Sequence, residues 1–81
     1  MPTVRLTRTK TRGGKSYGAW PSLIWLDGDD GTTRNIGIMR KAALQLWVAE
    51  YTHPRLGPMR LGARLRETLF DAIKQGIEEW T

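Results

Sequence analysis

The chain has 81 residues, no cysteine and a formal net charge of +5. This length allows one domain with one small core, and the lack of cysteine excludes a disulfide framework and any thiolate metal site. No apolar run approaches the roughly 20 residues of a membrane span, and the first residues lack the apolar segment of a signal peptide. We therefore expect a single domain over residues 1–81, located in the cytoplasm or on the nucleoid, with no membrane partner.

A basic arm over residues 4–15 is the first predicted element. Threonine alternates there with basic or apolar residues, as on a half-exposed strand. Gly13 and Gly14 can form a two-residue hairpin turn, which would place Val4 opposite Leu23 and gather the charge at the tip. The first fifteen positions hold no acidic residue and five basic ones: Arg5, Arg8, Lys10, Arg12 and Lys15. Such a concentration of positive charge indicates a polyanionic partner.

Further strands are predicted over residues 15–20, 22–26 and 32–38. Pro21 separates the first two, and an acidic, glycine-containing loop over residues 27–31 precedes the third. The apolar run over residues 23–26 does not alternate, so either both of its faces are covered or one face exposes apolar surface. We predict a small antiparallel sheet of three or four strands, with the basic hairpin, in residues 1–38.

Two amphipathic helices are predicted in residues 39–81, which completes an α+β fold. Leu44, Trp47, Val48 and Tyr51 have the i, i+3, i+4, i+7 spacing of one helix face, which predicts a helix over residues 40–51. A second stripe predicts a helix over residues 59–80; its members are Leu61, Leu65, Leu69, Ala72, Ile73, Gly76, Ile77 and Trp80.

No catalytic, cofactor or metal constellation is evident, so we do not expect an enzyme. His53 is the only histidine, and we interpret it as a loop residue before Pro54. Counted from Asp27 of the 27–31 loop, a calcium-binding loop would need an acid at its fifth position, glycine at its sixth and glutamate at its twelfth, where this chain has Gly31, Thr32 and Ile38. A solvated turn is the simpler interpretation.

The aromatic residues point to nucleic acid. Tyr17 shares a predicted strand face with cations of the arm, and Trp25 lies in a neighbouring strand. Single strands are commonly held by cations along the backbone and by rings on which bases stack. For Trp25, packing beneath the helices is an equal alternative. The candidate nucleic-acid-binding residues are Arg5, Arg8, Lys10, Arg12, Lys15, Tyr17 and Trp25.

The start of the second predicted helix is a candidate for a second phosphate site. Arg55, Arg60 and Arg64 would lie there beside the N–H groups that attract anions. The alternative, which we favour, is that arginine is simply a good helix former on a solvated face.

The order of strands, basic hairpin, acidic turn and helix over residues 4–50 resembles the transcriptional coactivators of the positive cofactor four family, with its bacterial and phage relatives. The resembling residues are Gly14, Lys15, Trp25, Asp27, Arg34, Gly37, Ile38 and Trp47, the last in a predicted helix. The resemblance implies a curved four-stranded sheet, a helix that mediates dimerisation, and binding of single-stranded or melted DNA. It also implies a stacking role for Trp25 and backbone contacts for Arg12, Lys15 and Arg34. The chain departs from the family in having Arg12 where an aromatic residue is usual, and in the helix predicted over residues 59–80.

The sequence therefore predicts a nucleic-acid-binding protein with little sequence preference, which acts in transcription regulation if the resemblance holds. DNA is favoured over RNA, single and double strands are both open, and a homodimer is expected. One alternative is a small phage-type inhibitor that binds a protein of a host nucleic-acid-processing machine. Another is a ribbon-helix-helix repressor that uses residues 35–39 as its strand and the two predicted helices.

Overall fold

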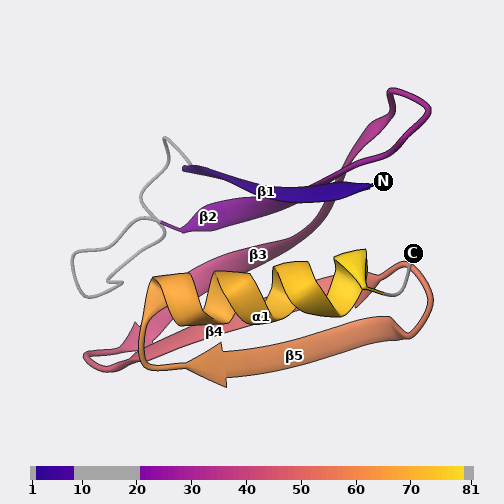
Figure 1. The fold of residues 1–81 in the computed structure, drawn as a ribbon. Coiled ribbons are helices and arrows are strands. Elements are labelled where there is room, and N and C mark those ends of the chain that lie inside the picture. Colours follow the sequence, from indigo (N-terminus) through magenta and orange to yellow (C-terminus); the bar gives the residue numbers. More distant parts are fainter. Residues whose placement is uncertain (1, 9–20, 80–81) are drawn as a thin grey trace.

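The computed structural model describes residues 2–8 and 21–79, which form a five-stranded antiparallel sheet followed by a helix (Figure 1). Each strand pairs with the next one along the chain, so β1 and β5 are the two edges of the sheet. The elements are β1 Thr3–Arg8, β2 Ser22–Asp27, β3 Thr33–Ala43, β4 Leu46–His53, β5 Gly57–Ala63 and α1 Arg66–Glu78. No helix in these residues has the length and apolar character that a membrane crossing requires.

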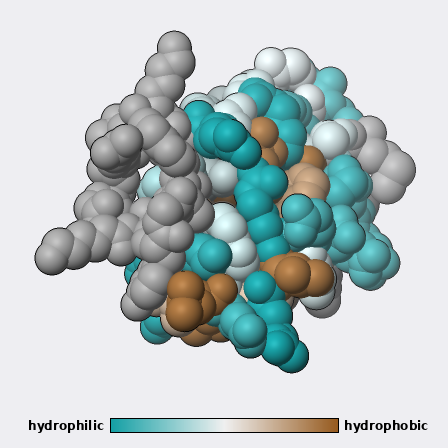
Figure 2. Space-filling model, turned by 90° about the vertical axis from the view of Figure 1, so that its left-hand side faces the viewer, coloured by the Kyte–Doolittle hydropathy of each residue, from teal (hydrophilic) through white to brown (hydrophobic). Residues whose placement is uncertain are grey.

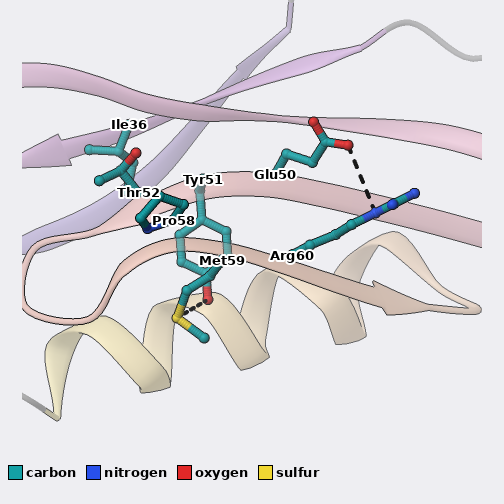
Figure 3. A pocket seen from close by; sticks show the side chains of 7 residues that line it. All are labelled: Ile36, Glu50, Tyr51, Thr52, Pro58, Met59 and Arg60. Carbon is teal, nitrogen blue, oxygen red and sulfur yellow. Dashed lines mark hydrogen bonds and ion pairs between the residues drawn. The ribbon is translucent and has the colours of Figure 1, made fainter.

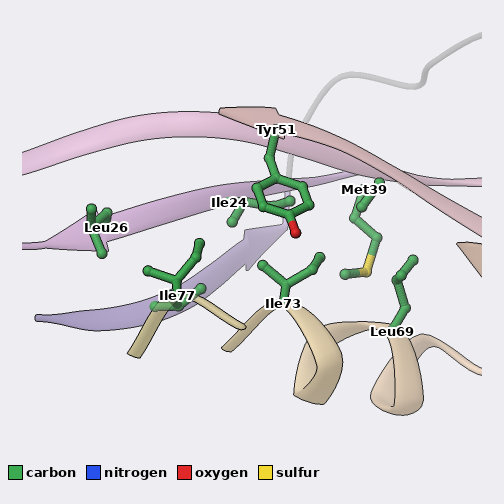
Figure 4. Close-up of a cluster of buried hydrophobic side chains, with 9 residues drawn as sticks. Ile24, Leu26, Met39, Tyr51, Leu69, Ile73 and Ile77 are labelled. Atoms are coloured by element: carbon green, nitrogen blue, oxygen red, sulfur yellow. The ribbon is translucent and has the colours of Figure 1, made fainter. Parts of the chain in front are cut away.

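The core lies between one face of the sheet and α1 (Figure 4). Because side chains alternate along a strand, every second residue of a strand points toward the helix. The strands contribute Val4, Ile24, Leu26, Met39, Ala49 and Tyr51, and α1 contributes Leu69, Ile73 and Ile77. We call the sheet face beneath α1 the core face and the opposite one the open face.

The sheet curves around α1. The helix contacts β1 at one edge and both β4 and β5 at the other. In a flat sheet of five strands the two edges would lie about 19 Å apart, whereas a helix with its side chains is only about 10–12 Å wide. One helix therefore bridges both edges only because the sheet bends toward it.

The β2–β3 turn confirms the predicted acidic loop. The backbone N–H of Gly28 donates to the carbonyl of Thr32 at 2.8 Å, and Gly31 has a φ of 82°, which glycine adopts without strain. The Asp30 carboxylate accepts hydrogen bonds from the hydroxyl and the backbone N–H of Thr32. These hydrogen bonds lower the pKa of Asp30, the hydroxyl contributing most.

His53 is buried at the end of β4, so its interpretation as a loop residue is wrong. Its Nδ1 accepts hydrogen bonds from the backbone N–H groups of Arg55 and Leu56, at 3.0 and 3.2 Å. Nε2 lies 3.0 Å from the carbonyl oxygen of Gly76 in α1. Since Nδ1 accepts these hydrogen bonds, Nε2 carries the proton and donates a hydrogen bond to the carbonyl oxygen of Gly76. The ring thus ties the β4–β5 turn to the helix.

The predicted helix over residues 40–51 is wrong, because this segment forms the end of β3, a tight turn and β4. Trp47, Ala49, Tyr51 and His53 alternate along β4 and face the core side, where Ala49, Tyr51 and His53 are buried. The helix that the family resemblance places after Ile38, with Trp47 in it, is therefore absent from this position.

The predicted helix over residues 59–80 is also wrong in its first part, which forms β5. Met59, Leu61 and Ala63 alternate and pack against the core, and α1 begins only at Arg66. The sheet thus has five strands and continues to Ala63, instead of three or four strands ending at residue 38. The ribbon-helix-helix alternative fails for the same reason, since its first helix is β4 and its second begins as β5.

The predicted pairing of Val4 with Leu23 is wrong by three residues. Val4 pairs with Leu26 and Leu6 pairs with Ile24. A shift by an odd number of residues moves a strand's side chains to the other face, so the predicted register would have separated Val4 from Ile24 and Leu26 in the core. The rest of the predicted arm and return strand, residues 9–20, lies outside the described residues.

Replacing Glu78 with glutamine is expected to make stability less sensitive to acid. The Glu78 carboxylate accepts a hydrogen bond from Lys74 Nζ at 2.7 Å and one from the backbone N–H of Val4 at 3.1 Å. These interactions, that with Lys74 being the largest, lower the pKa of Glu78 below its ordinary value of 4.5. A lowered pKa contributes stability that is complete above the unfolded value and is lost as pH falls through the folded value.

Urea unfolding of the wild type and Glu78→Gln at pH 7 and pH 3 measures this contribution. The difference between the two proteins should be largest at pH 7 and shrink toward pH 3. Glu79→Gln is the matched control, since Glu79 is exposed at the end of the same helix. A difference that stays constant between the two pH values would refute the assignment.

Candidate nucleic-acid interface

Trp25 lies on the open face, so the alternative that the ring packs beneath the helix is wrong. Its neighbours Ile24 and Leu26 point into the core, so the alternation of β2 directs Trp25 away from α1. Arg5 of β1 pairs with Trp25 on one side and Asn35 of β3 pairs with it on the other. The ring is partly buried among these neighbours rather than packed beneath the helix.

β1 positions a cation and a hydroxyl around the Trp25 ring. The guanidinium carbon of Arg5 lies 5.6 Å from the ring centroid, which is within cation–π range. The indole Nε1 donates a hydrogen bond to the Thr7 hydroxyl at 2.6 Å. Because Arg5 and Thr7 are two residues apart on one strand face, a single strand both fixes the plane of the ring and places a charge over it.

Asp27 holds Arg5 in place. Its carboxylate accepts hydrogen bonds from Arg5 Nε at 2.7 Å and from Arg5 Nη2 at 3.3 Å. The Thr33 hydroxyl donates a further hydrogen bond to Asp27 at 2.8 Å. The Arg5 hydrogen bonds, followed by that of Thr33, lower the pKa of Asp27, so this carboxylate is charged at neutral pH. Arg5 is therefore oriented but partly neutralised.

A second group of charges crosses the open face on β3, β4 and β5. Glu50 lies between Arg40 Nη2, at 3.3 Å from Oε1, and Arg60 Nε, at 3.8 Å (Figure 3 shows the pair with Arg60). One acid between two arginines leaves this ladder with a net positive charge. All three side chains are exposed, so the ion pairs add little to stability and the arginines are accessible to an external anion.

A pocket of about 460 Å³ opens beside this ladder (Figure 3). Its lining combines apolar side chains with the charged pair; the residues are Ile36, Glu50, Tyr51, Thr52, Pro58, Met59 and Arg60. The Tyr51 hydroxyl donates to the Met59 sulfur at 3.9 Å, and burial raises the pKa of this tyrosine. The pocket thus offers an apolar surface next to the exposed Arg60.

Of the residues predicted to bind nucleic acid, the structure brings Arg5 and Trp25 together. Arg8 and Arg34 are exposed but pair with Ser22 and Leu26, core-face residues of β2, so they do not belong to the open face. Neither forms an ion pair within residues 2–8 and 21–79. The other predicted residues, Lys10, Arg12, Lys15 and Tyr17, lie outside the described residues.

The phosphate site predicted at a helix start is not assembled as expected. Arg55 lies in the β4–β5 turn, Arg60 lies on β5 and Arg64 follows β5, whereas α1 begins at Arg66. Sequence reasoning also missed the pairing of Glu50 with Arg40 and Arg60. The strand alternation of residues 46–53 would have placed Glu50 on one face, and the two arginines join it only through the pairing of β3 and β5 with β4.

A comparison with protein-family models, curated proteins and solved structures finds no match for this chain. Its candidate function therefore depends on the geometry of the open face.

Proposed function

We propose that this protein binds single-stranded nucleic acid, DNA in preference to RNA, on the open face of its sheet and with its basic arm. The observation that carries the proposal is the Trp25 ring on the open face with Arg5 at 5.6 Å from its centroid. An aromatic ring beside a cation, on the sheet face opposite α1, is the arrangement that supports stacking of a base and neutralisation of its phosphate.

Binding would begin at Trp25, where a base of the nucleic acid replaces the Arg5 guanidinium over the ring. The displaced guanidinium pairs with an adjacent phosphate as the base stacks on the ring. Asp27 keeps Arg5 oriented in the free protein through two hydrogen bonds, and the phosphate competes with it in the complex. Thr7 holds the indole Nε1 throughout, so the plane of the ring is set before the base arrives.

The arginines of the ladder would extend the site across the sheet. Arg40 and Arg60 lie on β3 and β5, so a bound strand that crosses the sheet meets a cation beyond β2 as well. Stacking and phosphate contacts do not depend on base identity, which is why we expect low sequence specificity. The charge of residues 10–15 adds to the attraction without specifying a sequence.

Trp25→Leu is expected to weaken binding of a single-stranded oligonucleotide by about fivefold to a hundredfold, since stacking contributes about 1–3 kcal/mol per base. Fluorescence anisotropy of a labelled oligonucleotide measures the affinity. Trp25→Phe is the matched control, because it keeps a ring on which a base stacks and should retain most of the affinity. Equal binding by wild type and Trp25→Leu would contradict the proposal.

Arg40→Gln and Arg60→Gln should each flatten the salt dependence of binding. Each phosphate contact on a single strand contributes about 0.7 to the slope of log affinity against log salt concentration. The slope is measured by repeating the titration at several salt concentrations. Arg55→Gln is the control, since Arg55 is exposed in the β4–β5 turn away from the ladder. Unchanged slopes in both ladder variants would exclude these arginines from the site.

A further inference from the structure

A second pocket, of about 450 Å³, lies at the end of the molecule where the β3–β4 turn meets the junction between β5 and α1. We call it the leucine pocket; its lining residues are Lys41, Leu44, Gln45, Trp47, Arg64 and Leu65. Figure 2 looks at this end and shows apolar groups next to hydrophilic ones along its lower part. None of these six residues belongs to the proposed nucleic-acid site.

Two leucines that line the pocket expose most of their surface to solvent. Leu44 is 76% exposed and Leu65 is 61% exposed, and the neighbouring Leu46 is 40% exposed. Leu44 and Leu65 line one hollow and form an apolar patch there, which in a small protein often marks an interaction surface, whereas Leu46 does not line it. The partner that this patch fits must bring apolar side chains of its own.

The start of α1 provides an independent observation at the same place. Leu65 is the N-cap residue and makes no side-chain capping hydrogen bond, although serine, threonine, aspartate and asparagine are strongly preferred there. The first N–H groups of α1 therefore gain no hydrogen bond from the Leu65 side chain, and Glu67 is the acidic residue of this first turn. A carboxylate from outside would add a further acceptor for these N–H groups.

The rim of the pocket is positively charged. Within the described residues, neither Lys41 nor Arg64 forms an ion pair, and Arg64 instead donates a hydrogen bond to Gln45 Oε1 at 2.8 Å. A second copy of this chain, docked through the same patch by a two-fold axis, would bring like charges together. Nucleic acid would gain phosphate contacts but would leave Leu44 and Leu65 without apolar partners.

We propose that the leucine pocket docks an acidic segment of another protein, in which aspartate or glutamate adjoins leucine or an aromatic residue. The apolar side chain enters between Leu44, Leu65 and Trp47. The carboxylates pair with Lys41 and Arg64 and approach the N–H groups at the start of α1. Through this pocket the protein would join a partner while its open face stays available for nucleic acid.

Selection from a random displayed-peptide library against the full chain tests this proposal. The enriched peptides should combine Asp or Glu with Leu, Phe or Trp, and should bind Leu44→Ser/Leu65→Ser at least about tenfold more weakly than the wild type. Lys41→Gln/Arg64→Gln should weaken the same peptides and reduce the salt dependence of their binding. Leu56→Ser is the control, since Leu56 is 53% exposed but lies in the β4–β5 turn.

Three results would overturn the proposal. The first is no enrichment, or peptides that lack acidic residues or bind the leucine variant equally well. The second is binding of a single-stranded oligonucleotide that is lost in Leu44→Ser/Leu65→Ser, which would assign the pocket to nucleic acid. The third is self-association of the wild type that the same substitutions abolish. If the leucine variant does not fold, as judged by circular dichroism, the charge variant alone decides.

Discussion

Gly37→Ala is expected to destabilise the protein by at least about 3 kcal/mol, because its new methyl group would meet backbone that cannot move aside. A Cβ at position 37 would lie 2.2 Å from the carbonyl oxygen of Glu50 and 2.6 Å from the Cα of Tyr51. Gly37 pairs directly with Tyr51, so only a shift of β3 against β4 would make room. Urea unfolding followed by circular dichroism measures the loss.

Two other glycines are matched controls for this substitution. Gly76 lies in α1, and apart from the helix's own backbone no described residue lies within 4 Å of the place that a methyl group would take there, so Gly76→Ala should stabilise the helix by about 0.5–1 kcal/mol. In β5, a methyl group at Gly62 would meet ordinary contacts at 3.5 Å or more. A Gly37→Ala protein as stable as Gly62→Ala would show that β3 and β4 are not as close at this point as described.

Ile73→Ala should cost about 2–5 kcal/mol, which is the range for truncating a fully buried aliphatic side chain. Ile73 is 0% exposed and lies at the centre of the face that α1 presents to the sheet (Figure 4). A domain of 81 residues has a total stability of about 4–12 kcal/mol, so this single change removes a large share of it. Thermal and urea unfolding both report the effect.

The same substitution tests whether α1 joins the two edges of the sheet. Because the helix contacts β1 as well as β4 and β5, Ile73→Ala should lower amide-exchange protection in β1 and β5 together. Ile73→Val, which removes one methyl group, should cost only about 0.5–1.5 kcal/mol. Loss of protection in β5 alone would contradict a helix that bridges both edges.

The first part of the fold follows from the sequence because its signals do not conflict. A strand over residues 22–26, the acidic turn and the start of β3 were all predicted, since β-branched and apolar residues are bounded there by aspartate and glycine, and β2 extends one residue further, to Asp27. The register of β1 was not predictable from the Gly13–Gly14 turn alone. It depends on burying Val4 with Ile24 and Leu26, and this requires the position of α1.

The second half was predicted as helix because apolar residues four positions apart share a face both in a helix, which repeats every 3.6 residues, and in a strand, which repeats every two. Trp47 and Tyr51 share a face in a helix, and four is also an even number, so they share a face in a strand. Leu61, Leu65, Leu69, Ile73 and Ile77 repeat every four residues across both β5 and α1. Pro58 and Gly62 were the signals against helix in the first part of this stripe.

The candidate site was predicted only in part for the same reason. Arg5 and Trp25 lie on strands that the sequence identified, whereas Arg40, Glu50 and Arg60 meet only when residues 46–63 form two strands. His53 was missed because its role requires Gly76 from a distant helix. Long-range contacts of this kind leave no local pattern in the sequence.

The most direct test of the proposed function is an NMR titration of the ¹⁵N-labelled full chain with a single-stranded DNA oligonucleotide. We predict that the indole N–H signal of Trp25 and the amide signals of Arg5 and Thr7 shift in a salt-sensitive way. The amides of Leu69 and Ile73, beneath the sheet, should stay in place. Shifts confined to α1, with the Trp25 indole unchanged at saturation, would contradict binding on the open face.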